Sequence, residues 1–121
     1  MMKLFIDALF YKENYARNSL EGDRFSNCII AIESTLNRAQ LKSWEIQNNR
    51  LKIYYSTLNK CAEIGIYDAD SLGIYYYSDG NLITVNRILR DVKEVKFIQK
   101  GRIIYFFVKI KDKSYEEIFT I

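Results

Sequence analysis

Apolar residues recur at intervals of three and four positions between residues 25 and 39. The positions are Phe25, Cys28, Ile29, Ile32, Leu36 and Ala39. This spacing places them on one face of a helix. A looser stripe precedes them at Leu4, Phe5, Ala8, Leu9 and Tyr15. We therefore predict a helix over residues 1–42, with a weak point at 18–23, where Gly22 costs about 1 kcal/mol relative to Ala.

The pattern changes after Trp44 to short segments in which apolar and polar residues alternate, as in strands. Asn48-Asn49 and Asp79-Gly80 are typical of tight hairpin turns. Lys100-Gly101 and Asp112-Lys113 separate the last three segments. Ile88, Val92 and Val95 have helical spacing, which predicts a short helical turn at 87–91 before the next strand.

A helix followed by consecutive hairpins is the segregated α+β pattern. We predict one domain over residues 1–121, with a long N-terminal helix (1–43) packed on a mainly antiparallel, hairpin-linked sheet (44–121). Each buried Leu, Ile or Phe contributes roughly 1.5–3 kcal/mol to such a core. The sheet residues predicted to receive the helix are Ile53, Ile64, Ile66, Phe97, Ile104, Phe106 and Val108.

The net charge of +3 is unevenly distributed along the chain. Residues 1–81 carry nine Lys/Arg and ten Asp/Glu, whereas residues 82–121 carry nine and five. The basic stretch 87–102 is interrupted by Asp91 and Glu94. We favour a solvated rim that protects sheet edges over a nucleic-acid patch. The isolated domain should therefore bind DNA weakly and in a salt-sensitive way.

The sequence lacks the residues that most catalytic sites require. It contains no histidine, which excludes Ser-His-Asp and Cys-His catalysis and most catalytic zinc sites. It has no glycine-rich phosphate loop and no EF-hand spacing. Asp68 and Asp70 fit a solvated turn better than a metal pair. We predict a non-enzymatic protein without a cofactor or a small-molecule substrate.

Two cysteines, Cys28 and Cys61, allow two interpretations. In a reducing compartment both are buried thiols that behave as small hydrophobes. Outside the cell they can form one disulfide that ties helix to sheet. The sequence does not decide between them.

Aromatic residues point to a partner surface on the predicted sheet. Successive strand residues face opposite sides, and one helix covers only one side. The other side then exposes more apolar area than is usual for a soluble monomer. The candidate partner residues are Tyr75, Tyr77, Ile103, Tyr105 and Phe107. The alternative is that loops or an additional strand cover this face.

The N-terminus is unusually apolar but is neither a signal peptide nor a membrane span. It is either a hydrophobic cap on the fold or the end of a longer apolar helix. We predict that residues 1–15 extend from the domain or lie at its edge. Leu4, Phe5, Leu9 and Phe10 are then candidate stem residues for assembly.

The order of these segments resembles minor pilins and pseudopilins, and most closely the ComGF type of the competence machinery of Gram-positive bacteria. The resemblance covers roughly residues 24–121. It rests on Ile32, Glu33, Leu36 and Ala39 of the helix, and on Val95, Phe97, Gly101, Tyr115 and Phe119 near the end. The family's processing motif is absent, so the resemblance implies that Met1–Tyr11 is the remainder of a membrane helix.

The resemblance implies an extracytoplasmic domain anchored to the membrane by an N-terminal helix that this chain lacks. Its partners would be other pilin-like subunits of a type IV pilus, a competence (DNA uptake) machine or a type II secretion-like machine. The alternative is a cytoplasmic nucleic-acid- or protein-binding module that uses the basic stretch 87–102 and the tyrosine-rich sheet.

Overall fold

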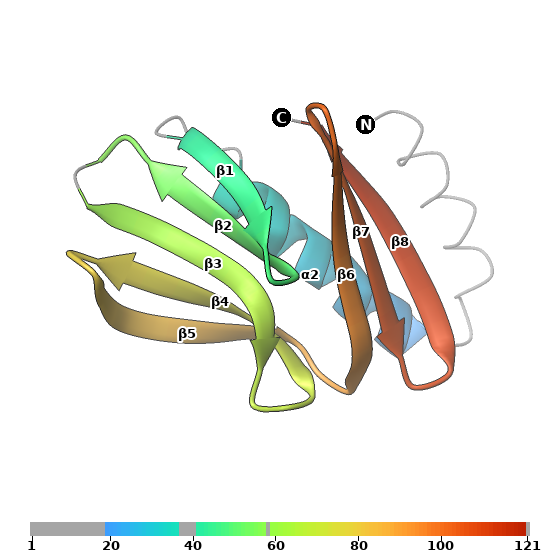
Figure 1. Cartoon of the computed structure of the whole chain (residues 1–121). Coiled ribbons are helices and arrows are strands. Elements are labelled where there is room, and N and C mark those ends of the chain that lie inside the picture. Colours follow the sequence, from blue (N-terminus) through green and yellow to red (C-terminus); the bar gives the residue numbers. More distant parts are fainter. Residues whose placement is uncertain (1–18, 37–40, 58, 121) are drawn as a thin grey trace.

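A computed structural model describes residues 19–36, 41–57 and 59–120. This part of the chain contains helix α2 (Ser19–Leu36) followed by eight strands (Figure 1). The strands are β1 (Leu41–Gln47), β2 (Arg50–Tyr55), β3 (Lys60–Tyr67), β4 (Ser71–Ser78), β5 (Asn81–Leu89), β6 (Val92–Lys100), β7 (Ile103–Ile110) and β8 (Lys113–Thr120).

The strands form two antiparallel meanders. The first sheet has the order β1-β2-β3-β4-β5 and the second has the order β6-β7-β8. Arg90 and Asp91 connect the two sheets, and Asp91 has a φ of 60°. The predicted helical turn at 87–91 is therefore wrong, because residues 87–89 continue β5 and only Arg90 and Asp91 lie between β5 and β6. Ile88, Val92 and Val95 have helical spacing because all three contribute to the core from the two strands on either side of this corner.

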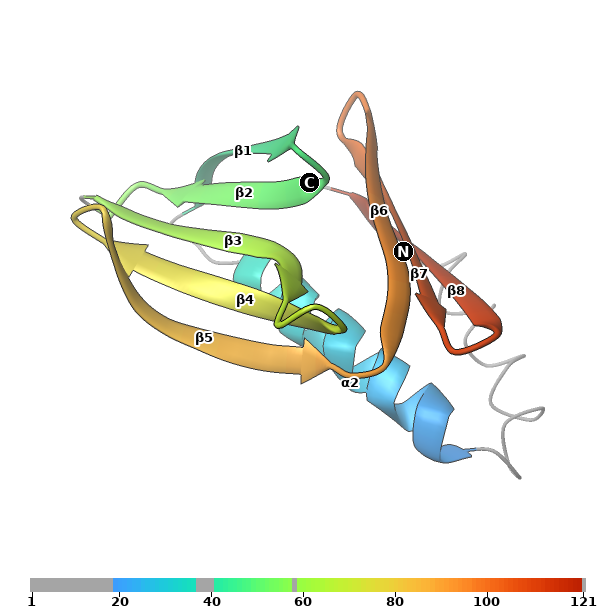
Figure 2. The same ribbon diagram turned by 60° about the horizontal axis from the view of Figure 1, so that its bottom comes forward.

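Helix α2 lies across both sheets and joins their cores (Figures 1 and 2). Phe25 near its beginning stacks on Tyr115 of β8, with ring centroids 4.8 Å apart. Near its end, the backbone oxygen of Thr35 accepts a hydrogen bond of 3.1 Å from the Tyr55 hydroxyl of β2. The helix therefore contacts both sheets, the three-stranded sheet through Phe25 and the five-stranded sheet through Thr35 and along β5.

The predicted helical stripe is confirmed, but the predicted fold class is wrong. Cys28, Ile29, Ile32 and Leu36 are all buried, and Phe25 is half-buried. The protein is nevertheless mainly β, with one short described helix and two sheets, in place of a long helix on one sheet. Residues 41–43 belong to β1 and not to the helix. The first eighteen residues of the predicted helix lie outside the described residues.

The tight turns agree closely with the sequence prediction. Asn48 and Asn49 have φ values of 53° and 58°, and Asp79 and Gly80 have 55° and 80°. Both turns thus have the left-handed backbone that two-residue hairpins require. The last two turns are displaced by one residue at most, since they lie at 101–102 and 111–112.

Asn49 also holds the two sheets together. Its amide nitrogen donates a hydrogen bond to the backbone oxygen of Val95, and its side-chain oxygen accepts one of 3.0 Å from the backbone N–H of Phe97. The amide therefore satisfies two backbone groups on edge strand β6. Because unpaired strand edges attract other strands, this contact also protects part of the edge.

Replacing Ile32 by Ala should destabilise the whole protein. Ile32 is fully buried in the shared core, so the substitution should lower the free energy of unfolding by about 2–5 kcal/mol. Ile30→Ala is a matched control on the same helix, because Ile30 is 62% exposed, and it should change stability by less than about 0.5 kcal/mol. Urea unfolding measures both values. Equal effects of the two substitutions would contradict this account of the core.

Candidate functional site

The outer face of the five-stranded sheet carries Tyr75 and Tyr77, two of the five predicted partner residues. Tyr75 lies in a cross-strand row with Lys52 and Glu63. Tyr77 lies in the next row with Tyr54 and Cys61. Both tyrosines are half-buried, so neighbouring side chains already cover much of their surface.

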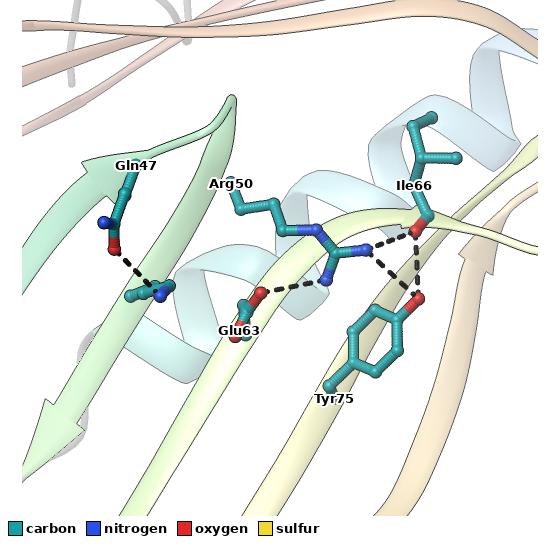
Figure 3. A network of polar contacts seen from close by, with 6 residues as sticks. Gln47, Arg50, Glu63, Ile66 and Tyr75 are labelled. Carbon is teal, nitrogen blue, oxygen red and sulfur yellow. Dashed lines mark hydrogen bonds and ion pairs between the residues drawn. The ribbon is translucent and has the colours of Figure 1, made fainter.

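Arg50, the first residue of β2, extends over this face and contacts Tyr75 (Figure 3). Its guanidinium lies 4.8 Å from the centre of the Tyr75 ring and forms an ion pair of 2.9 Å with Glu63. The Arg50 guanidinium and the Tyr75 hydroxyl both donate hydrogen bonds to the backbone oxygen of Ile66, at 3.0 and 2.9 Å. Tyr75 is therefore part of an internal polar network and is a poor anchor for a partner.

Gly65 makes room for this network. A Cβ atom at this position would lie 2.7 Å from Cγ of Arg50, which crosses directly over the glycine. The bare backbone at Gly65 lets the arginine lie flat on the sheet. The aliphatic part of Arg50 thus covers sheet surface that a larger residue would otherwise occupy.

An open groove lies at the other end of the same face. It has a volume of about 690 Å³ and contains Tyr54, Cys61 and Lys60. Burial, followed by the nearby Glu63 carboxylate, raises the pKa of the Cys61 thiol. Because the thiolate is the reactive form, the protonated Cys61 is a weak nucleophile at neutral pH. Cys61 is therefore not an activated nucleophile in this groove.

The outer face of the three-stranded sheet carries a group of apolar side chains. Ile103, Tyr105 and Phe107 follow one another along its central strand β7. Ile98 of β6 and Ile118 of β8 lie on either side of Tyr105. Ile98 is 50% exposed and Tyr105 is 38% exposed. We call these five residues the β6–β8 patch.

Charged residues of both signs border the β6–β8 patch. Lys96 and Lys100 belong to β6, and Lys100 Nζ lies 5.8 Å from the centre of the Tyr105 ring. Glu116 belongs to β8, directly across Phe107 from Lys96. An apolar centre with a charged rim is the usual composition of a protein–protein interface.

The predicted partner surface is therefore divided between two sheets. Ile103, Tyr105 and Phe107 lie together, whereas Tyr75 and Tyr77 lie on the other sheet. The sequence prediction missed Ile98 and Ile118. The sequence pattern could have identified Ile98. Val95 and Phe97 are two residues apart and both point into the core, so Ile98, the next residue after Phe97, must point outward.

The structure also divides the basic stretch 87–102. Arg87 belongs to the five-stranded sheet, where its guanidinium lies 5.6 Å from the centre of the Tyr67 ring. Lys96 and Lys100 border the β6–β8 patch on the other sheet. Lys96 is also paired with Glu94 at 3.3 Å. The stretch is thus not one continuous basic surface.

Cys28 and Cys61 are both free thiols and lie on opposite sides of the five-stranded sheet. Cys28 is fully buried in the core between helix and sheets, and burial raises the pKa of its thiol to about 12. Cys61 lies on the outer face with Tyr54 and Tyr77. The disulfide that the sequence allowed is therefore not present in the structure.

The remaining candidate residues do not form a site. Asp68 and Asp70 lie in the turn between β3 and β4, where Asp68 Oδ2 is 3.7 Å from a guanidinium nitrogen of Arg87. No group of three His, Cys, Asp or Glu suited to a metal ion occurs within residues 19–36, 41–57 and 59–120. In the same ranges, no helix combines the length and apolar character needed to cross a bilayer. The stem candidates Leu4, Phe5, Leu9 and Phe10 lie outside the described residues.

Comparisons with known proteins found no relative of this chain. No protein-family model, no curated protein and no solved structure matches it.

The two thiols should differ sharply in reactivity. In the native protein at pH 8, a thiol reagent should modify Cys61 and leave Cys28 unmodified, because Cys28 is fully buried and protonated. After denaturation without reductant, both thiols should react. Spectrophotometric thiol counting measures this. Finding no free thiol in the denatured, non-reduced protein would show a disulfide and contradict the assigned positions of Cys28 and Cys61.

Proposed function

We propose that the protein is a non-enzymatic assembly subunit that binds other protein chains through the β6–β8 patch. The observation that carries the proposal is the apolar centre of this patch, with Ile98 and Tyr105 exposed on a face that also carries Ile103, Phe107 and Ile118. Exposed apolar surface of this kind, bordered by charges, is typical of interaction sites.

The class of assembly comes from the resemblance to minor pilins and pseudopilins. We propose that the partners are other pilin-like subunits of a type IV pilus, a competence machine or a type II secretion-like machine, on the extracytoplasmic side of the membrane. An anchoring helix upstream of Met1 would complete such a subunit. The proposal does not rely on the fold that the resemblance implied, since a long helix on one sheet is not what this protein has. It relies on the patch and on the quoted residues.

A non-enzymatic role fits the chemistry of the side chains. The chain has no histidine, and the partly exposed thiol of Cys61 is kept protonated. A protein partner is favoured over a nucleic acid because Glu94 and Glu116 border the same surface as Lys96 and Lys100. Acidic side chains beside the patch repel phosphates, so tight binding of DNA is not expected.

Ile98→Lys should weaken binding to pilin-like subunits from the same genome by at least about tenfold. The substitution removes one buried isoleucine from the interface, which is worth roughly 1.5–3 kcal/mol. Ile83→Lys is the matched control, because Ile83 is also an exposed strand isoleucine (64%) but lies on β5 of the other sheet. Calorimetric titration of the purified pairs measures both affinities.

Two results would contradict the proposed function. The first is that the unmodified protein binds none of the pilin-like subunits. The second is that Ile83→Lys weakens binding as much as Ile98→Lys, since the interface would then not depend on the β6–β8 patch. Thermal unfolding of both variants shows that any loss of binding does not come from a loss of fold.

A further inference from the structure

We propose that the β6–β8 patch is self-complementary and that its partner is a second copy of this chain. The two copies pack face to face about a two-fold axis that runs along β7. This inference rests on the proposed function, because it names the partner of the same surface.

The side chains of the patch form three cross-strand rows on the outer face of the three-stranded sheet. The rows, each read from β6 through β7 to β8, are Lys96–Phe107–Glu116, Ile98–Tyr105–Ile118 and Lys100–Ile103–Thr120. In these three rows the central column is apolar, the bases lie on the β6 side, and the acid lies on the β8 side. The next row on the same face, Glu94–Lys109–Ser114, adds an acid on β6 and a base on β7 beyond the patch. The polarity across the width therefore belongs to the three rows of the patch.

A two-fold rotation about an axis parallel to β7 brings opposite charges of the two copies together. It places β6 of one copy over β8 of the other at the same height along the strands. Lys96 then faces Glu116 of the second copy, and the same pair occurs again on the other side of the axis. Ile98 faces Ile118 of the second copy, and the aromatic rings of the two central columns meet near the axis. Such an interface is isologous, the commonest type in homodimers.

The charges near the patch are available for these pairs. Glu116 is exposed and makes no ion pair or hydrogen bond with any described residue. Lys96 is paired with Glu94 only at the surface, where its side chain is 57% exposed. A uniformly acidic partner would be repelled by Glu116, and a uniformly basic one by Lys96 and Lys100. A copy of the chain matches both signs at once.

The size of the face predicts a weak dimer. Three strands about 4.8 Å apart and eight residues long cover roughly 400 Å². This is about half of the 800 Å² that each partner buries in a standard interface. We therefore expect association that depends on concentration, with a dissociation constant in the micromolar range or weaker.

Charge reversal in the full chain tests the proposal by sedimentation equilibrium. Glu116→Lys and Lys96→Glu should each weaken dimerisation by about tenfold, because each places like charges opposite one another at two symmetric positions. The double variant Lys96→Glu/Glu116→Lys should recover most of the lost affinity, because it inverts both members of each intermolecular pair and leaves only the new repulsion between residue 96 and Glu94 within each copy. Lys60→Glu, an exposed lysine on the other sheet, is the control and should have no effect.

Several outcomes would overturn the proposal. One is a double variant that remains as weak as the single variants. Another is a full chain that stays monomeric at high concentration. If the chain is monomeric, a thiol reagent can show why. In the double variant Ile98→Cys/Cys61→Ser, a thiol at position 98 that does not react would show that another segment, such as residues 1–18, covers the face.

The experiments distinguish a failure of the proposed function from a failure of the second-copy inference. If the protein is monomeric but Ile98→Lys still abolishes binding to pilin-like subunits, only the second-copy inference is wrong. If the protein dimerises as described but binds no pilin-like subunit, the second-copy inference holds and the pilin-type function is wrong.

Discussion

Phe25 of α2 stacks on Tyr115 of the three-stranded sheet, while the end of the same helix accepts a hydrogen bond from Tyr55 of the five-stranded sheet. The positions of both sheets depend on this shared helix. Each sheet buries one apolar face in the core, and burial of those faces is the main favourable contribution to folding. Between these contacts, Cys28 and Ile32 are fully buried in the core that both sheets share. The Asn49 amide adds a polar contact at the sheet–sheet boundary.

Because the inner faces are used for folding, only the outer faces remain for function. The two outer faces differ in what they offer a partner. Arg50 covers part of the outer face of the five-stranded sheet and contacts Glu63 and Tyr75 within the same molecule. On the outer face of the three-stranded sheet, Lys96 pairs with Glu94 and Lys100 lies near the Tyr105 ring, while the central side chains Ile103 and Phe107 are apolar. An apolar face bordered by charges of both signs is a surface on which another chain can pack.

The features that the sequence predicted correctly depend on residues that are close together in the sequence. The spacing of Cys28, Ile29 and Ile32 indicates a buried helical face, and Asn48-Asn49 is sufficient for a hairpin turn. The division into two sheets was not predictable in this way, because a meander of eight strands has the same local pattern in one sheet as in two. The break depends on the left-handed conformation of Asp91, which a non-glycine residue adopts only in a suitable context. Similarly, the local pattern around Tyr75 indicates a partner residue. Arg50 contacts Tyr75 from 25 positions earlier in the chain, and local spacing does not reveal such a contact.

The central claim is that the β6–β8 patch is the working surface of the protein. Isoleucine methyl NMR of the full chain tests it most directly, because isoleucines lie both in the patch and on other exposed surfaces. As the protein concentration rises, the methyl signals of Ile98, Ile103 and Ile118 should shift, while those of the exposed Ile30 and Ile83 should stay constant. Shifts at Ile30 or Ile83 without shifts in the patch would contradict the account.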